Sequence, residues 1–143
     1  MRFERTTKIA APRETVFAYV SDFARHPEWS GHGLTMQVSP GPPAVGTTFS
    51  TEAHQLGKQS DAGTVTELVS GRRVVFETSG KAGTVRHWFD VQDADGGSTV
   101  SKGMEFVKPS LQARLASPGI RLNAPRMLAK DLAKIKARLE SST

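Results

Sequence analysis

The sequence predicts an α+β fold in which a seven-stranded antiparallel sheet packs against a long C-terminal helix, with two short helices after the first strand. Three observations carry this prediction. Apolar and polar residues alternate near the N-terminus, short alternating runs separated by turn residues fill the middle of the chain, and helical spacing returns after Pro109.

The length of 143 residues is typical of one domain, which we expect to span residues 1–143. The chain has no Cys, which excludes disulfide bridges, thiolate zinc sites and cysteine nucleophiles. It has no apolar run of 18 residues, and MRFERTTKI lacks the apolar segment of a signal peptide. We therefore expect a soluble, cytoplasmic protein with no membrane span.

The net charge of +5 is concentrated near the C-terminus, where residues 121–143 carry six basic and two acidic side chains. These basic residues are spread along one predicted helix, with no interleaved aromatic residues that could stack on bases. A solvated helix face explains them better than nucleic-acid binding does, so we expect no nucleic-acid partner. A protein-interaction module using this basic tail is a weaker alternative.

The first strand is expected at residues 2–10, where polar and apolar side chains alternate. An amphipathic helix is expected at residues 11–20, with Pro12 in its first turn. A second short helix is expected at residues 22–26, because its first residue is a capping aspartate and Pro27 would end it.

Six further strands are expected in the middle of the chain. Clusters of Gly, Pro, Ser and Asp mark the turns between them, and every connection is short enough for an antiparallel hairpin. The expected strands are 34–39, 46–56, 60–69, 72–79, 83–93 and 98–107.

The C-terminal helix is expected at residues 125–139, with Asn123 as its N-cap and Pro125 in its first turn. Pro118 and Gly119 are expected to interrupt the helical segment before it. Only the sheet can cover the apolar face of this helix. That face is formed by four residues at helical spacing, namely Leu128, Leu132, Ile135 and Leu139.

Four segments of the chain are similar in sequence to segments of a known family. They are IAAPRETVFAYVSDFARHPEW, with Asp22, Pro27 and Trp29 in an Asp-x-x-x-x-Pro-x-Trp pattern, and GTVTELVSGRRVVFE, TVRHWFDV and DGGSTVSKGMEF. Together they resemble the polyketide cyclase/dehydratase branch of the START-like (SRPBCC) superfamily, over about residues 2–140. The resemblance implies a helix-grip fold, in which the antiparallel sheet is curved around the long helix and leaves an apolar cavity between them. Members hold lipids, sterols, polyketides, hormones or aromatic substrates there, some as enzymes and many as carriers.

Strand alternation predicts which side chains face such a cavity. His87 shares the apolar face of its strand, and Lys102 shares the apolar face of the next strand unless a bulge reverses it. The face of strand 60–69 is ambiguous, because Val65 and Leu68 lie on opposite parities. For each candidate, ordinary core packing is the alternative. The candidate ligand-binding residues are Phe17, Trp29, Phe49, Phe76, Thr78, His87, Phe89, Lys102, Met104, Phe106, Leu128 and Leu132.

Two functions remain open at this point. The preferred one is binding or transport of a small hydrophobic or aromatic molecule, because no convergent set of reactive groups is evident. The alternative is a cyclase or dehydratase acting on an aromatic precursor, with His87 as general base and Thr78 or Lys102 orienting a carbonyl.

Other features of the sequence indicate no further chemistry. His26 and His32 are expected to be exposed beside Trp29, without a third metal ligand, so we expect no metal and no cofactor. Trp88, on the expected outer face of the sheet, suggests a covered surface, which leaves a homo-oligomer open.

Overall fold

The structure is a computed structural model that describes residues 1–30, 33–54 and 58–141. Its strands form one antiparallel sheet in the order β1-β7-β6-β5-β4-β3-β2. In chain order the elements are β1 (Arg2–Ile9), α1 (Arg13–Val20), the 3₁₀ helix η1 (Phe23–Glu28), β2 (Thr35–Val38), β3 (Thr48–His54), β4 (Lys58–Val69), β5 (Arg73–Gly80), β6 (Gly83–Ala94), β7 (Gly97–Pro109), α2 (Leu111–Leu115) and α3 (Ser117–Ser141).

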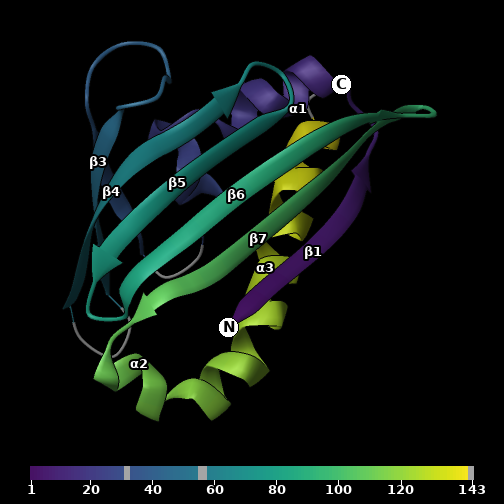
Figure 1. Cartoon of the computed structure of the whole chain (residues 1–143). Helices are drawn as coiled ribbons and strands as arrows, with labels where there is room; N and C mark the ends of the chain where they lie inside the picture. Colours follow the sequence, from purple (N-terminus) through teal and green to yellow (C-terminus); the bar gives the residue numbers. More distant parts are fainter. Residues whose placement is uncertain (31–32, 55–57, 142–143) are drawn as a thin grey trace.

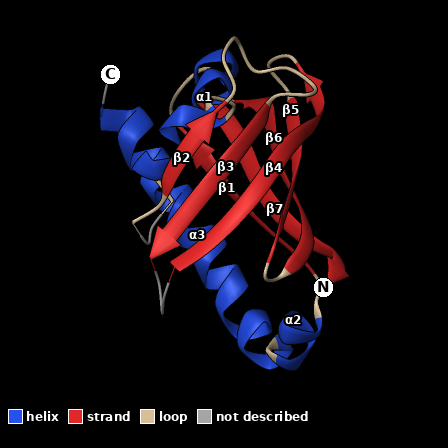
Figure 2. Cartoon of the chain, turned by 90° about the vertical axis from the view of Figure 1, so that its left-hand side faces the viewer, coloured by secondary structure: helices blue, strands red, loops and turns tan. Residues whose placement is uncertain are grey.

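The sheet curves around α3, and α1 and η1 close one end of its concave face (Figure 1). Seen from the side, α3 crosses the whole sheet diagonally, and α2 lies beyond the ends of the strands (Figure 2). This arrangement confirms the expected α+β helix-grip fold with seven antiparallel strands. Among the described residues, no helix is long and apolar enough to cross a membrane.

The core fills the space between the concave face and the helices. Val16 of α1, Phe89 of β6 and Ile135 of α3 are fully buried in one cluster. At its centre the ring of Phe23 stacks on Phe49 and meets Phe76 edge-on, with both ring centroids 5.0 Å away. Aromatic contacts of this kind stabilise a core beyond their area burial, so η1 is held firmly over the sheet.

The strands lie where the sequence predicts them. Each strand end that the structure describes differs from the predicted end by at most two residues. The expected end of strand 46–56 lies outside the described residues. The ambiguity in β4 is resolved by a β-bulge, because the register shifts between Val65 and Glu67. The extra residue reverses the parity, so that Val65 and Leu68 pair with Phe76 and Val74 and face the core together.

The expected start of the C-terminal helix is wrong. α3 begins at Ser117 and continues through Pro125, without the expected interruption or a cap at Asn123. Pro118 falls in the first turn, where a backbone N–H has no helical partner and proline is therefore tolerated. Pro125 removes one internal hydrogen bond, and the burial of Ala124 and Leu128 on either side offsets that loss.

The second short helix also differs from expectation. Pro27 was expected to end it at His26, but η1 is a 3₁₀ helix that includes Pro27 and runs to Glu28. Its i→i+3 bonding winds the chain more tightly than an α-helix.

On the outer face, Trp88 is covered by its own chain. Its indole N–H donates to the carboxylate of Glu4 at 2.7 Å, and the Arg2 guanidinium lies 4.6 Å from the ring centre. The ring also lies flat over Gly103, where a Cβ atom would come within 2.1 Å of it. The covered surface that the sequence suggested is therefore provided within the chain, and it requires glycine at position 103.

Candidate functional site: a cavity between the sheet and the helices

A cavity of about 370 Å³ lies between the concave face of the sheet, η1 and the middle of α3. This volume is at the lower end of the range for small-molecule pockets. Its lining is mainly aromatic and aliphatic, with several polar groups among them. Eight of the residues predicted from the sequence line it, namely Trp29, Phe49, Phe76, Thr78, His87, Lys102, Met104 and Phe106.

The other four predicted residues lie in the core. Phe17, Phe89, Leu128 and Leu132 are buried, and none of them lines the cavity. Phe89 faces inward like His87, but the Trp29 ring packs against it with centroids 5.6 Å apart. The inward face of a strand therefore includes both cavity lining and core.

His87 lies on one wall of the cavity, stacked on the Phe76 ring with centroids 4.9 Å apart and planes 9° apart. Its Nε2 atom is 3.1 Å from the Thr78 hydroxyl, and the two can share one hydrogen bond. The His87 side chain is half-buried, because one part of it packs in the interior and another part faces the cavity. Burial, together with the nearby Lys102 and His26, lowers its pKa to about 3. The imidazole is therefore neutral near pH 7 and is a weak base.

His26 is buried, contrary to the expectation that it is exposed. Its Nε2 atom donates a hydrogen bond to the Val20 carbonyl at 2.9 Å, and its ring lies 4.6 Å from both Phe23 and Trp29. Burial lowers the pKa of His26 to about 3. Phe23, His26 and Trp29 recur every three residues, which is the period of a 3₁₀ helix, and this signal could have placed His26 inside. His32 lies outside the described residues.

Lys102 and Asp131 form a buried ion pair that the sequence analysis missed. The Lys102 Nζ atom lies 3.4 Å from the Asp131 carboxylate, and the residues are 7% and 6% exposed. Nζ also lies 5.3 Å from the Trp29 ring centre and 5.6 Å from that of Phe89, within the range of cation–π attraction. Burial lowers the pKa of Lys102, and the Asp131 charge opposes this effect.

Asp131 could have been found from helical spacing. It lies three residues after Leu128 and four before Ile135, so it falls within the apolar stripe of α3. Sequence reasoning assigned only the basic residues of this helix to a solvated face and did not single out Asp131. A buried charge of this kind must find a partner, and β7 supplies one.

Asp61 is a further polar residue of the lining that sequence reasoning did not single out. It lies on β4 opposite Thr51, and its carboxylate extends over Gly80 of β5. Partial burial raises its pKa above the ordinary value. The unresolved parity of strand 60–69 concealed its inward direction.

The polar residues that line the cavity therefore include two histidines, three hydroxyl residues, an ion pair and a half-buried carboxyl group, where the sequence indicated no convergent polar set. A neutral imidazole can accept a proton or a hydrogen bond, and a lysine can stabilise a carbonyl or oxyanion. Among the described residues, no group of three or more His, Asp or Glu is placed to hold a metal ion.

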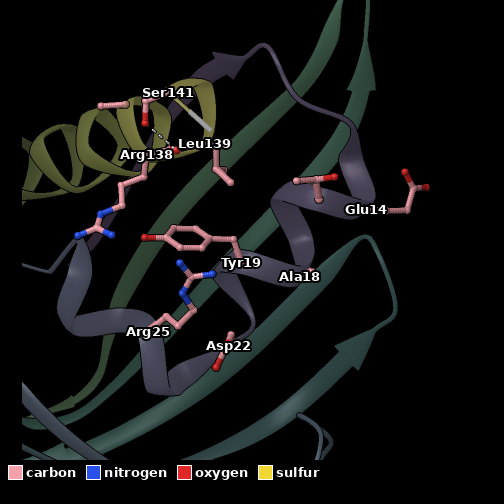
Figure 3. A pocket seen from close by; sticks show the side chains of 10 residues that line it. Glu14, Ala18, Tyr19, Asp22, Arg25, Arg138, Leu139 and Ser141 are labelled. Carbon is pink, nitrogen blue, oxygen red and sulfur yellow. Dashed lines mark hydrogen bonds between the residues drawn. The ribbon is translucent and has the colours of Figure 1, made fainter. Parts of the chain in front are cut away.

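A larger hollow of about 1170 Å³ lies on the outside, between α1 and the C-terminal end of α3 (Figure 3). Polar groups beside it already bond one another: Glu28 accepts hydrogen bonds from the Tyr19 hydroxyl, Arg25 and Arg138. Burial and the Glu28 contact raise the pKa of Tyr19 to about 12, so its hydroxyl remains protonated. This network ties η1 to α3, and the internal cavity remains the candidate site.

The buried histidines predict a loss of stability in acid. The unfolded chain takes up protons near the ordinary histidine pKa of 6.5, whereas folded His26 and His87 do so only near pH 3. The stabilisation is complete above pH 6.5 and is lost as the pH falls toward 3. From pH 6.5 to 5, above the ordinary carboxyl range, each histidine should cost about 1–2 kcal/mol of unfolding free energy.

Urea denaturation at pH 6.5 and pH 5 measures this loss. His26→Gln and His87→Gln should each lose less stability than the wild type over this interval, whatever their stability at pH 6.5. Equal losses in the wild type and in the double variant would show that neither histidine is the cause.

The ion pair predicts strong coupling between β7 and α3. Lys102→Met leaves a carboxylate buried without its cation and should destabilise the chain by about 3–5 kcal/mol. Asp131→Leu should cost less, because a lysine whose pKa burial has already lowered can lose its proton. The double variant should be more stable than Lys102→Met alone. Denaturation of all four proteins tests this, and additive losses would contradict it.

Comparison of the chain with known proteins gives both a family and a fold. Residues 1–140 match the family described as polyketide cyclase / dehydrase and lipid transport. No curated protein is significantly similar to the chain. Many solved structures share its fold.

Three of these structures illustrate how similar they are to this chain in sequence identity, TM-score and coverage. Protein CV1439 from Chromobacterium violaceum is 19% identical, with a TM-score of 0.75 and 98% of each chain covered. TTHA0849 from Thermus thermophilus is 14% identical, with a TM-score of 0.81 over 100% of this chain and 99% of its own. The di-domain ARO/CYC protein StfQ of the steffimycin biosynthetic pathway is 14% identical, with a TM-score of 0.79 over 99% of this chain and 51% of its own.

At these identities the structural likeness shows the fold alone. The family match covers almost the whole chain and agrees with the sheet order, the curved concave face and the long helix across it. The chain therefore belongs to the polyketide cyclase/dehydrase and lipid transport family, within the START-like helix-grip superfamily.

Proposed function

We propose that this protein binds and carries a small aromatic or otherwise hydrophobic molecule in its internal cavity. The observation that carries the proposal is a cavity of about 370 Å³ whose mainly apolar walls hold a few polar groups. Apolar walls supply affinity by excluding water, and a few placed polar groups orient the ligand.

The polar groups suggest what kind of molecule fits. A planar ring can pack beside the stacked Phe76 and His87 rings, where face or edge contacts are favourable. A carbonyl or phenolic oxygen on that ring can accept from the Thr78 hydroxyl or from Lys102. The ion pair carries no net charge, so the cavity suits a neutral ligand with one or two oxygens. The family description, which includes lipid transport, also supports a hydrophobic ligand.

Further parts of the proposal concern the chain as a whole. Residues 1–143 act as one domain, since the last turns of α3 are bonded to the end of β1, where Lys136 donates to the Lys8 carbonyl and Glu140 accepts from the Ala10 N–H. The lack of Cys suits a reducing compartment such as the cytoplasm.

Filling the cavity should prevent binding. Thr51 faces the cavity from β3, so Thr51→Phe places a ring in the ligand space and should weaken binding by about tenfold or more. The matched control is Thr48→Phe, which adds the same ring on the exposed side of that strand. Fluorescence of the neutral dye N-phenyl-1-naphthylamine, displaced by naphthol, measures binding, and circular dichroism checks folding.

Unchanged displacement in folded Thr51→Phe would contradict the assignment of the cavity as the binding site. Equal weakening by Thr48→Phe would do the same, because it would place the dye elsewhere.

A second candidate is a cyclase or dehydratase acting on an aromatic precursor. The observation that favours it is the meeting of a proton acceptor, His87, with the cation of Lys102 in one cavity. Catalysis of this type needs a base and an electrostatic stabiliser near one substrate position. We rank it second because a histidine with a pKa of about 3 is far from the value near neutrality that suits a general base.

The two candidates differ in what His87→Gln should do. Under the enzyme hypothesis, ring formation from a linear poly-β-carbonyl precursor should fall by about 100-fold, which is far more than any loss in displacement of the dye by naphthol. Ultraviolet absorbance of the aromatic product measures the rate. Equal rates in variant and wild type, or no turnover by the wild type, would reject the enzyme and leave the carrier.

A further inference from the structure

The segment formed by α2 and the first turns of α3 is apolar on two opposite faces. One face packs inward, where Ala113, Ala124 and Leu128 are buried against β6 and β7, with Ile120 and Met127 beside them. That face accounts for the attachment of the segment to the sheet. The opposite face has no such role in the fold.

The outward face carries three exposed leucines. Leu111, Leu115 and Leu122 are 73%, 77% and 56% exposed. Their spacing of i, i+4 and i+11 follows one helical stripe, and only Ala116 interrupts the helix between α2 and α3. A single exposed leucine is ordinary, but three along one stripe form an unpartnered apolar surface.

Basic residues flank this stripe. Between Glu105 and Asp131 the chain has five basic residues and no acidic one. Arg114, Arg121 and Arg126 are exposed, and none of them forms an ion pair with the part of the chain that the structure describes. The surface is therefore both apolar and positively charged.

The segment lies at one end of the molecule, beyond the strand ends and away from α1 (Figure 2). The β5–β6 turn is attached to it, because Ser110 donates from its N–H to the Ala82 carbonyl and from its hydroxyl to that of Lys81. Gly83, the first residue of β6 after that turn, and Met127 of α3 both line the cavity. The cavity therefore extends to the same end of the molecule.

We propose that this leucine–arginine surface, formed by Leu111, Leu115, Leu122, Arg114, Arg121 and Arg126, docks on the surface of an anionic lipid bilayer. An apolar stripe with basic flanks lies in the bilayer interface, with leucines among the acyl chains and arginines at the headgroups. Nucleic acid would match the charge but leave the leucines in water. A second copy would bury the leucines but bring the arginines of two chains together.

The test is flotation of the full chain with two kinds of vesicle, one of phosphatidylcholine alone and one of phosphatidylcholine and phosphatidylglycerol in equal parts. We expect binding to the anionic vesicles only, and its loss in about 1 M NaCl, where the Debye length is about 3 Å. The double variant Leu111→Ser/Leu115→Ser should bind them at least about tenfold more weakly. The matched control Val45→Ser, which changes a 64% exposed valine elsewhere, should bind like the wild type.

Charge variants test the other component of the surface. Arg114→Gln/Arg121→Gln should weaken binding to anionic vesicles, whereas Arg72→Gln, an exposed arginine on the β4–β5 turn, should not. All the substituted side chains are exposed, so circular dichroism should show an unchanged fold.

Several results would overturn the proposal. One is no wild-type binding to anionic vesicles at low salt, and another is undiminished binding by the leucine variant. Binding to duplex DNA as tightly as to vesicles, unaffected by the leucine changes, would assign the surface to nucleic acid. A dimer in light scattering that the leucine variant dissociates would assign it to self-association.

Binding to vesicles is expected to be independent of ligand binding in the cavity. The leucine variant should still bind naphthol, and Thr51→Phe should still float with anionic vesicles. Failure of vesicle binding alone therefore rejects the docking surface, and failure of naphthol binding alone rejects the proposed ligand site.

Discussion

The packing of α3 across the concave face of the curved sheet is the constraint on which the rest of the structure depends. In its second half, Leu132 and Ile135 meet α1 and the sheet in a filled core. Near its middle, Met127 and Asp131 border open space instead. The helix packs closely again where Ala124 and Leu128 are buried beside β6 and β7, so the cavity is a local gap in this contact.

Four of the polar groups that line the cavity are neutral or paired. Burial holds His26 and His87 uncharged near pH 7, and Lys102 and Asp131 compensate each other. Such pairs cost desolvation energy and add little stability compared with apolar packing, so their presence beside a cavity suggests a role in recognition. The interior consequently has mainly apolar walls and can form hydrogen bonds at a few positions, and Asp61 adds a half-buried carboxyl group to its lining.

Sequence predictions that depend only on neighbouring residues were confirmed. Predictions were wrong or undecided where a bulge, a 3₁₀ helix or packing between distant elements decides the structure. The strand period of two depends on adjacent residues, and it placed His87 and Lys102 on the inner face. A β-bulge and a 3₁₀ helix change the period within a few residues, which concealed Asp61 and His26. The C-terminal helix was predicted to begin late, because proline was interpreted as a helix start although packing on the sheet sustains the helix through it.

The sequence by itself determined the order of elements, the inward faces of most strands and the absence of thiol chemistry. These depend on local periodicity and on composition. Only the tertiary structure decided that Phe76 lines a cavity while Phe89 lies in the core, and that Lys102 meets Asp131 from a different element. Both depend on strand register and on how far the helix stands from the sheet, distances that no local pattern encodes.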